Sequence, residues 1–165
     1  MITITAATIN DIKQIQNIVN ITWPITYGEI LSKEQLDYML GLFYSTEALK
    51  EQYNKKKQLF YMIDEDETNI GFIGIEHNYN GEAVTKIHKI YLLPETQGKG
   101  IGKKVIDEIG KLALENNSKA LFLNVNRFNS ALGFYKKIGF EVNEEVDIEI
   151  GNGYLMEDYV MEKKL

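Results

Sequence analysis

The chain of 165 residues contains no cysteine, only two prolines and a single tryptophan. Without cysteine it can form no disulfide, no thiol nucleophile and no cysteine-ligated metal site. No apolar run approaches the roughly 20 residues that a membrane span needs. The N-terminal segment also lacks the basic and then apolar pattern of a signal peptide. We therefore expect one domain over residues 1–165, cytoplasmic and without a membrane partner.

Basic residues are in the minority. The chain has 18 lysines and arginines against 24 acidic residues, a formal net charge of −6. A nucleic-acid-binding domain usually presents a basic face, so no nucleic-acid partner is expected. The charge suits a cationic partner such as an amine, and it serves solubility equally well. The two histidines stand among scattered carboxylates without ligand spacing, so no metal is expected.

The apolar residues change their period along the chain. Alternation over residues 2–6 predicts a strand, and helical spacing then predicts three helices in succession. Trp23-Pro24 predicts the end of the first helix, because the residue before a proline avoids the helical region. Ser32 and Gln35 form a capping-box pattern at the start of the second helix.

The second half of the chain alternates strands and helices. Strands are predicted over residues 59–63, 70–77 and 84–93, with Asn80-Gly81 as a two-residue hairpin turn. A helix, a short strand, another helix and two final strands follow. The order β-α-α-α-β-β-β-α-β-α-β-β predicts an α+β fold, with a mixed, mostly antiparallel sheet of about seven strands flanked by helices.

A glycine-rich turn, Gln97-Gly98-Lys99-Gly100-Ile101-Gly102, stands between a predicted strand and a predicted helix. Glycine lets the backbone turn tightly and approach a ligand closely. The unpaired amides of the first helical turn and the helix dipole attract an anion, such as a phosphate or pyrophosphate. The spacing is neither that of a P-loop nor that of a dinucleotide-binding turn. The alternative is a turn with a purely structural role.

Two longer segments resemble a known family. IYLLPETQGKGIGKKVIDEIGKLALE is similar to the cofactor motif of the GNAT acetyltransferases, and LFLNVNRFNSALGFYKKIGFEV resembles the second motif of that family. The two stand in the expected order, each on the expected elements. The order of elements extends the likeness to nearly the whole chain, although the detailed likeness is confined to the second half.

The resemblance implies acetyl-CoA as cosubstrate, and it implies where acetyl-CoA binds. Amides from Gly98 to Lys103 would hold the pyrophosphate, the pantetheine arm would lie between two splayed strands, and Asn129 would bind that arm. An amide near Tyr91 or Leu92 would stabilise the oxyanion that develops on the thioester. Asn129 also suits a plain helix cap. The implied cofactor-binding residues are Ile90, Tyr91, Leu92, Gln97, Gly98, Lys99, Gly100, Ile101, Gly102, Lys103, Asn129 and Tyr135.

The resemblance also suggests an acid and a base. Tyr135 occupies the position of the family's general acid, which protonates the departing thiolate; the alternative is a core aromatic. His88 lies near the position where many members carry a carboxylate, and an imidazole ordinarily titrates in a useful range. Strand alternation places His88 on the face of Ile90 and Leu92. A histidine without a catalytic role is the alternative, and the rival bases are Glu76, His77 and Glu29.

The acceptor site is predicted from aromatic and acidic residues of the first half. Trp23, Tyr27, Glu29 and Glu76 are the predicted substrate-binding residues, because aromatic walls and carboxylates suit a cationic amine. Aromatic residues at helical spacing are also typical of a core. The acidic C-terminal segment, residues 146–165, either rims the site or forms a solvated strand face.

The resulting hypothesis is an N-acetyltransferase that moves an acetyl group from acetyl-CoA to a primary amine by direct attack in a ternary complex. The acceptor is predicted to be a small amine such as a polyamine or an amino acid. Two alternatives stay open: acetylation of a protein N-terminus or lysine, and a CoA-binding sensor without turnover. A homodimer is a further partner that the resemblance allows.

Overall fold

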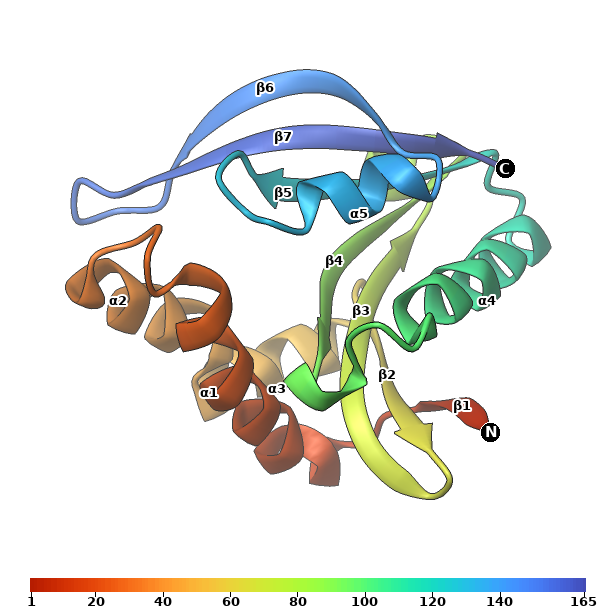
Figure 1. Ribbon diagram of the computed structural model, residues 1–165, viewed down its shortest axis with the longest axis horizontal. Helices are drawn as coiled ribbons and strands as arrows, with labels where there is room; N and C mark the ends of the chain where they lie inside the picture. The colour runs from red at the N-terminus through yellow and green to blue at the C-terminus, as the bar shows by residue number, and fades with distance from the viewer.

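The computed structural model describes residues 1–165. A seven-stranded sheet runs in the order β1-β2-β3-β4-β5-β7-β6. Every neighbouring pair is antiparallel except β4 and β5, which are parallel. Figure 1 shows α1, α2 and α3 on one side of the sheet and α4 on the other. The predicted α+β fold and the predicted order of strands and helices are confirmed.

The elements follow the chain in this order: β1 (Ile2–Ala6), η1 (Ile9–Asp11), α1 (Ile12–Tyr27), α2 (Lys33–Tyr44), α3 (Thr46–Lys55), β2 (Leu59–Glu65), β3 (Thr68–His77), η2 (Tyr79–Gly81), β4 (Val84–Leu92), η3 (Pro94–Thr96), α4 (Ile101–Glu115), β5 (Ala120–Asn126), α5 (Leu132–Lys137), β6 (Glu141–Glu149) and β7 (Leu155–Lys164). No helix combines the length and the apolarity that crossing a bilayer requires.

Each face of the sheet has its own hydrophobic core. On one face, the apolar stripe of α4, which includes Ile101, Val105 and Ile109, packs on strand residues such as Ile73 and Leu121. Each such side chain contributes about 1.5–3 kcal/mol when it is fully buried. The other face carries a separate cluster under α1, α2 and α3, which includes Trp23, Met39, Tyr44, Leu49 and Phe72. The sheet therefore separates two independently packed layers.

The first helix does not end at Trp23-Pro24. It continues to Tyr27 with Pro24 inside it, and the amide of Gly28 donates to the carbonyl of Pro24 at 3.0 Å. A proline inside a helix removes one backbone hydrogen bond. Here Trp23 is buried, and its ring lies 4.7 Å from that of Tyr27, so packing of this last turn on the sheet outweighs that loss.

Two turns also differ from the sequence prediction. Asn80-Gly81 is not a two-residue hairpin turn, because β3 ends at His77 and β4 begins at Val84, with η2 in the longer connection. The two-residue turn is instead Asp66-Glu67 between β2 and β3. Both residues have positive φ, 47° and 67°, as a type I′ hairpin requires.

Candidate active site

A gap opens in the middle of the sheet where β4 and β5 separate. Their parallel pairing runs from Val84 opposite Ala120 to Ile87 opposite Leu123 and stops there. Beyond it lies a narrow cavity of about 50 Å³ between the strands. Its walls include Ile90, Tyr91, Leu123, Val125, Asn129 and Tyr135. A strand-like ligand can add to the backbone that the missing pairing leaves free.

A β-bulge in β4 lies beside this gap. Gly74 pairs with Lys89 and Ile75 pairs with Ile87, so His88 is the extra residue. A bulge interrupts strand alternation, and the prediction that His88 shares a face with Ile90 and Leu92 is wrong. Ile87, Ile90 and Leu92 belong to the α4 core, whereas the imidazole lies near Glu76 on the opposite face.

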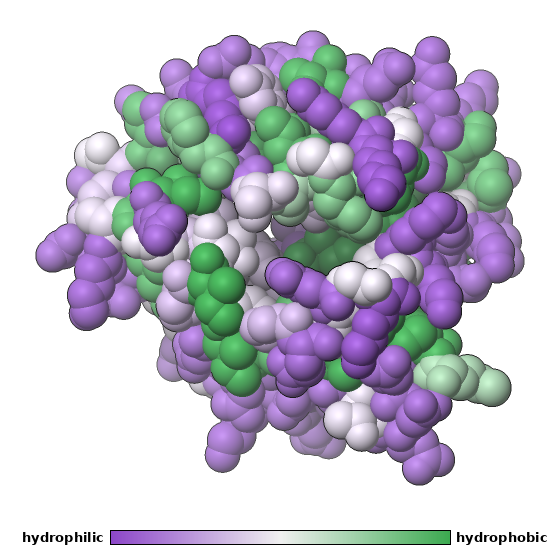
Figure 2. All heavy atoms as spheres, in the orientation of Figure 1, coloured by the Kyte–Doolittle hydropathy of each residue, from purple (hydrophilic) through white to green (hydrophobic).

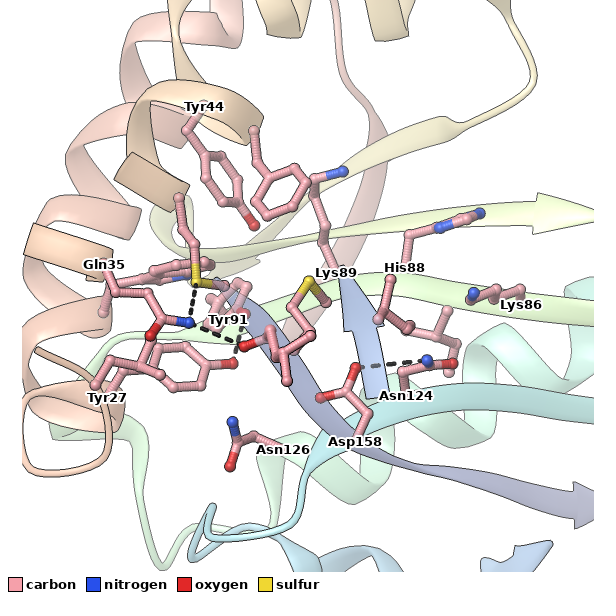
Figure 3. A pocket seen from close by; sticks show the side chains of 18 residues that line it. Tyr27, Gln35, Tyr44, Lys86, His88, Lys89, Tyr91, Asn124, Asn126 and Asp158 are labelled. Carbon is pink, nitrogen blue, oxygen red and sulfur yellow. Dashed lines mark hydrogen bonds between the residues drawn. The ribbon is translucent and has the colours of Figure 1, made fainter. Parts of the chain in front are cut away.

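A larger cavity of about 230 Å³ lies on the α1–α2 side of the sheet and adjoins the gap. The two cavities share Tyr27, Ile87, His88, Lys89, Tyr91 and Asn124 in their walls. Figure 2 shows a hollow with apolar atoms at its floor, between the side of the molecule that carries α1 and α2 and the side that carries α4. One wall of this cavity is aromatic and consists of Trp23, Tyr27, Tyr44 and Tyr91. Another wall is polar and consists of Asn124, Asn126 and Asp158 (Figure 3).

Two tyrosines stand where the cavities meet. The hydroxyl oxygens of Tyr27 and Tyr91 are 3.1 Å apart and share a hydrogen bond. Burial raises the pKa of both phenols, so both are neutral at physiological pH. Trp23 also lines the larger cavity, and its ring centroid lies 6.0 Å from that of Tyr91. Two of the four predicted substrate-binding residues, Trp23 and Tyr27, therefore line this cavity.

The other two predicted substrate-binding residues lie outside both cavities. Glu29 is exposed in the turn after α1. Glu76 lies on β3, and its Oε1 is 3.3 Å from Nε2 of His88. Burial lowers the pKa of His88 to about 3, and the charges of Lys86 and Lys89 act in the same direction despite that carboxylate. The imidazole is therefore neutral near pH 7, and the expectation that it titrates there is wrong.

Lys89 is the second residue of the bulge, and its amine is buried on the α3 side. Its Nζ donates to Oε1 of Gln52 at 2.8 Å and to Oε1 of Gln58 at 2.6 Å. It also lies 5.8 Å from the ring centroid of Tyr44 and 5.5 Å from that of Phe60. Burial lowers the pKa of Lys89 to about 7. The sequence did not predict this position of Lys89, because the bulge in β4 is what places its side chain on the α3 side of the sheet.

Asp158 is the other group that sequence reasoning missed. It is 4% exposed on β7, and burial raises the pKa of its carboxyl group. The C-terminal segment was expected either to rim the site or to form a solvated face, and it does both: Asp158 lines the cavity, whereas Glu157 beside it is exposed. Alternation along β7 from Met156, which packs in the α1–α3 cluster, was the available signal.

The glycine-rich turn has the predicted form at the start of α4. Gly98 and Gly100 have φ of 78° and 71°, and a Cβ atom built on either meets no atom within 4 Å. Gly100 is the N-cap residue and carries no capping side chain, so the first amides of α4 face open space. Gly102 instead packs on Phe134, whose ring lies 3.0 Å from the Cβ position. This arrangement fits a pyrophosphate at Gly98–Gly100.

The remaining side chains of the turn have acidic neighbours. Nζ of Lys99 lies 3.9 Å from Glu65, and Nζ of Lys103 lies 2.6 Å from Asp107. Gln97, the C-cap residue of η3, and Ile101, the first residue of α4, complete the turn. Side-chain charges of the turn are thus partly neutralised, which leaves its backbone amides as the principal donors to an anion.

The second motif places Asn129 and Tyr135 at the gap. Oδ1 of Asn129 accepts from the amide of Ala131 at 2.8 Å in a turn just before α5. The N-cap residue of α5 is Ala131, which has no side-chain cap, so the predicted cap role of Asn129 is wrong. Tyr135 on α5 packs edge-on against Phe140, with ring centroids 5.7 Å apart. Burial raises the pKa of Tyr135, so its hydroxyl keeps its proton at neutral pH. Tyr135 therefore packs on the core and also lines the gap.

The gap between parallel strands, the glycine-rich turn at a helix start and the aromatic cavity beside the gap are features that fit an acyltransferase with an extended cofactor. Residues 29–163 match the family model described as acetyltransferase (GNAT) domain. The chain belongs to the GNAT superfamily and is an acetyl-CoA-dependent N-acetyltransferase.

Individual relatives agree with this assignment. The chain is 31% identical to a spermidine N(1)-acetyltransferase of Thermoplasma acidophilum over 161 residues, which cover 94% of this chain and 92% of the relative. It is 28% identical to the uncharacterised N-acetyltransferase YuaI of Bacillus subtilis over 95% of this chain and 90% of that one. The crystal structure of PaiA N-acetyltransferase from Thermoplasma acidophilum in complex with coenzyme A superposes with a TM-score of 0.81 at 29% identity, covering 100% of this chain and 99% of that one.

Proposed function

We propose that this enzyme acetylates a small primary amine that binds in the larger cavity and attacks acetyl-CoA directly in a ternary complex. The observation that carries the proposal is the shared wall of the two cavities, at Tyr27, Tyr91 and Asn124. A thioester at the end of the gap and an amine in the aromatic cavity would meet at that wall, which is the proximity that direct transfer needs.

Contacts between α2 and the β6–β7 hairpin close one side of the larger cavity, which favours a small acceptor over a protein chain. Nε2 of Gln35 on α2 donates to the carbonyl of Leu155 at 2.9 Å, and the hydroxyl of Tyr38 donates to the carbonyl of Ile150 at 2.6 Å. These bonds tie α2 to the β6–β7 hairpin. They also explain why the capping box of α2 is half formed: Ser32 accepts from the amide of Gln35, but the side chain of Gln35 is used elsewhere.

The backbone of β4 supports one choice for the oxyanion donor. The amide of Leu93 donates to the carbonyl of Ile70 in β3. Successive amides of an antiparallel strand point to opposite sides, so the amides of Leu92 and Ile90 are directed towards the gap. We therefore assign the oxyanion to the amide of Leu92 rather than to that of Tyr91. The carbonyl oxygen of the thioester would accept from it as the charge develops.

The transfer forms the bond from the amine nitrogen to the thioester carbonyl carbon and breaks the bond from that carbon to sulfur. The thiolate of CoA takes a proton from the hydroxyl of Tyr135, which is protonated at neutral pH. The phenolate regains a proton from the new amide nitrogen, directly or through water. His88, neutral and at the shared wall, would accept a hydrogen bond from the acceptor.

The test is thiol release from acetyl-CoA, measured with a thiol reagent across polyamines, amino acids, aminoglycosides and short peptides. The enzyme itself adds no background, because it has no cysteine. Release that depends on a small amine supports the proposal. Release with peptides alone would favour protein acetylation, and acetyl-CoA binding without release from any acceptor would favour a sensor. The spermidine acetyltransferase named above makes polyamines the first compounds to test.

A further inference from the structure

Asp158 is a buried carboxylate without a cation. It is 4% exposed, and none of the ion pairs of the molecule includes it. Its one hydrogen bond comes from Nδ2 of Asn124, and the two atoms are 3.5 Å apart. A buried charge is costly unless a partner compensates it. The positive charges of Lys86 and Arg127 act on Asp158, but neither side chain forms an ion pair with it, so the carboxylate has room for a direct cationic partner from outside the chain.

The carboxylate lies where a bound acceptor would be. It lines the larger cavity with Asn124 and Asn126, across from Tyr27 and Tyr91 (Figure 3). Tyr27 and Asp158 both line this cavity, and the charge of Asp158 contributes to the raised pKa of Tyr27. Asn124, its hydrogen-bond partner, belongs to the wall shared with the gap. Asp158 is thus one side chain away from the place where amine and thioester would meet.

We propose that Asp158 binds the ammonium form of the acceptor and takes the proton that the nitrogen must lose before it attacks. This inference rests on the proposed function. The N–H bond breaks, its electron pair stays on nitrogen, and the proton moves to a carboxylate oxygen of Asp158. The neutral amine then bonds to the acetyl carbon, and the bond from that carbon to sulfur breaks. The second proton of the nitrogen replaces the one that Tyr135 gives to the departing thiolate. The proton leaves Asp158 for water when the product departs.

Other titratable groups around the cavity are less suited to this role. His88 is a weak base, because its pKa is about 3. Nζ of Lys89 on β4 is directed away from Asp158, to Gln52 and Gln58 on the α3 side. The guanidinium of Arg127, which also acts on Asp158, pairs with Glu145 and Asp147. The Nζ of Lys86 is already engaged by the hydroxyl of Tyr79 at 3.2 Å. Tyr27 and Tyr91 stay protonated near pH 7. The raised pKa of Asp158 brings its basicity closer to what proton transfer needs.

The decisive variant is Asp158→Asn, which keeps shape and removes both charge and basicity. Its matched control is Glu157→Gln, the same change one residue earlier at an exposed position. We would measure kcat/KM from pH 6 to 9 with three named acceptors: spermidine, benzylamine and the less basic glycinamide. Acetyl-CoA affinity and thermal unfolding show whether each variant is folded.

We expect Asp158→Asn to lose on the order of 100-fold in kcat/KM at pH 7, while Glu157→Gln stays near wild type. The wild-type profile should be nearly flat below the pKa of the amine, because the enzyme accepts the ammonium. The Asp158→Asn profile should rise about tenfold per pH unit as free amine appears, and the loss should be smallest for glycinamide. Removal of the uncompensated charge should leave thermal stability equal or higher.

Two results would overturn the inference without touching the proposed function: an Asp158→Asn profile parallel to the wild type, or equal losses in both variants. Strong destabilisation of a folded Asp158→Asn variant would show that the carboxylate stabilises the fold. That result would also overturn the inference. The proposed function itself would be overturned if the wild type released no thiol with any of the three acceptors or with any compound of the wider panel.

Discussion

Lys89 offers a test of the electrostatics of β4 that needs no substrate. Its pKa falls from 10.5 in the unfolded chain to about 7 in the folded one, because the amine is buried. At 1.36 kcal/mol per unit, this difference costs the folded state about 5 kcal/mol wherever both states are protonated, which is at pH 7 and below. In the folded state Nζ donates to the side-chain carbonyls of Gln52 and Gln58.

The pH dependence has a definite sign. Between pH 7 and 10.5 the unfolded chain binds a proton at Lys89 that the folded chain has lost. The free energy of unfolding therefore rises with pH by up to about 1.4 kcal/mol per unit in this window. Lys89→Met should remove this contribution, because methionine fills a similar volume without titrating. We expect the wild-type curve to be steeper than that of the variant between pH 7 and 9.5.

The assay is urea denaturation at half-unit steps from pH 6 to 9.5, with Lys50→Met as control at an exposed position of α3. The difference between wild type and Lys89→Met should be constant below pH 7 and should change above it. The raised pKa values of the buried tyrosines act on both proteins alike, so they cancel. Parallel curves for the wild type and Lys89→Met would refute the reasoning.

Three further substitutions test the site. Gly100→Asp should abolish acetyl-CoA binding in calorimetry, since it places a carboxylate and a strained positive φ where the pyrophosphate would lie; unchanged affinity in a folded variant would contradict that placement. Tyr135→Phe should lower kcat by about 100-fold with little change in acetyl-CoA affinity, and equal turnover would remove Tyr135 from the catalytic groups. His88→Ala should leave the shape of the pH–rate profile intact from pH 6 to 9, because the imidazole is already neutral there, whereas a lost basic limb would show that it titrates. The same variant should lose less stability on acidification from pH 6.5 towards 4, since the folded wild type resists protonation of His88 and the unfolded chain does not.

The second half of the molecule was the more predictable from sequence, because its signals are local. Glycines at fixed spacing before a helix predict the turn at Gly98–Gly100, and the resemblance predicts that Asn129 and Tyr135 lie near it. The first half depends on contacts between distant segments. Pro24 stays inside α1 because Trp23 and Tyr27 pack on the sheet, and no pattern within the helix records that packing.

The side chains that set the electrostatics of the site were the hardest to predict. One inserted residue in β4 reverses the face of His88 and turns Lys89 towards Gln52 and Gln58. A bulge of this kind arises from pairing with β3, and strand alternation read from β4 alone cannot show it. Asp158 lies in an acidic segment, where alternation from Met156 is the signal that distinguishes it from the exposed Glu157.

The opening between β4 and β5 connects the two sides of the sheet. The acceptor cavity lies on the α1–α2 side, whereas the glycine-rich turn belongs to α4, which covers the other side (Figure 1). In the proposed ternary complex the two reactants would approach from opposite sides of the sheet and would meet only at this opening. Neither has to leave before the other can enter, so initial-rate plots should intersect rather than run parallel, and free CoA and the acetylated amine can depart independently.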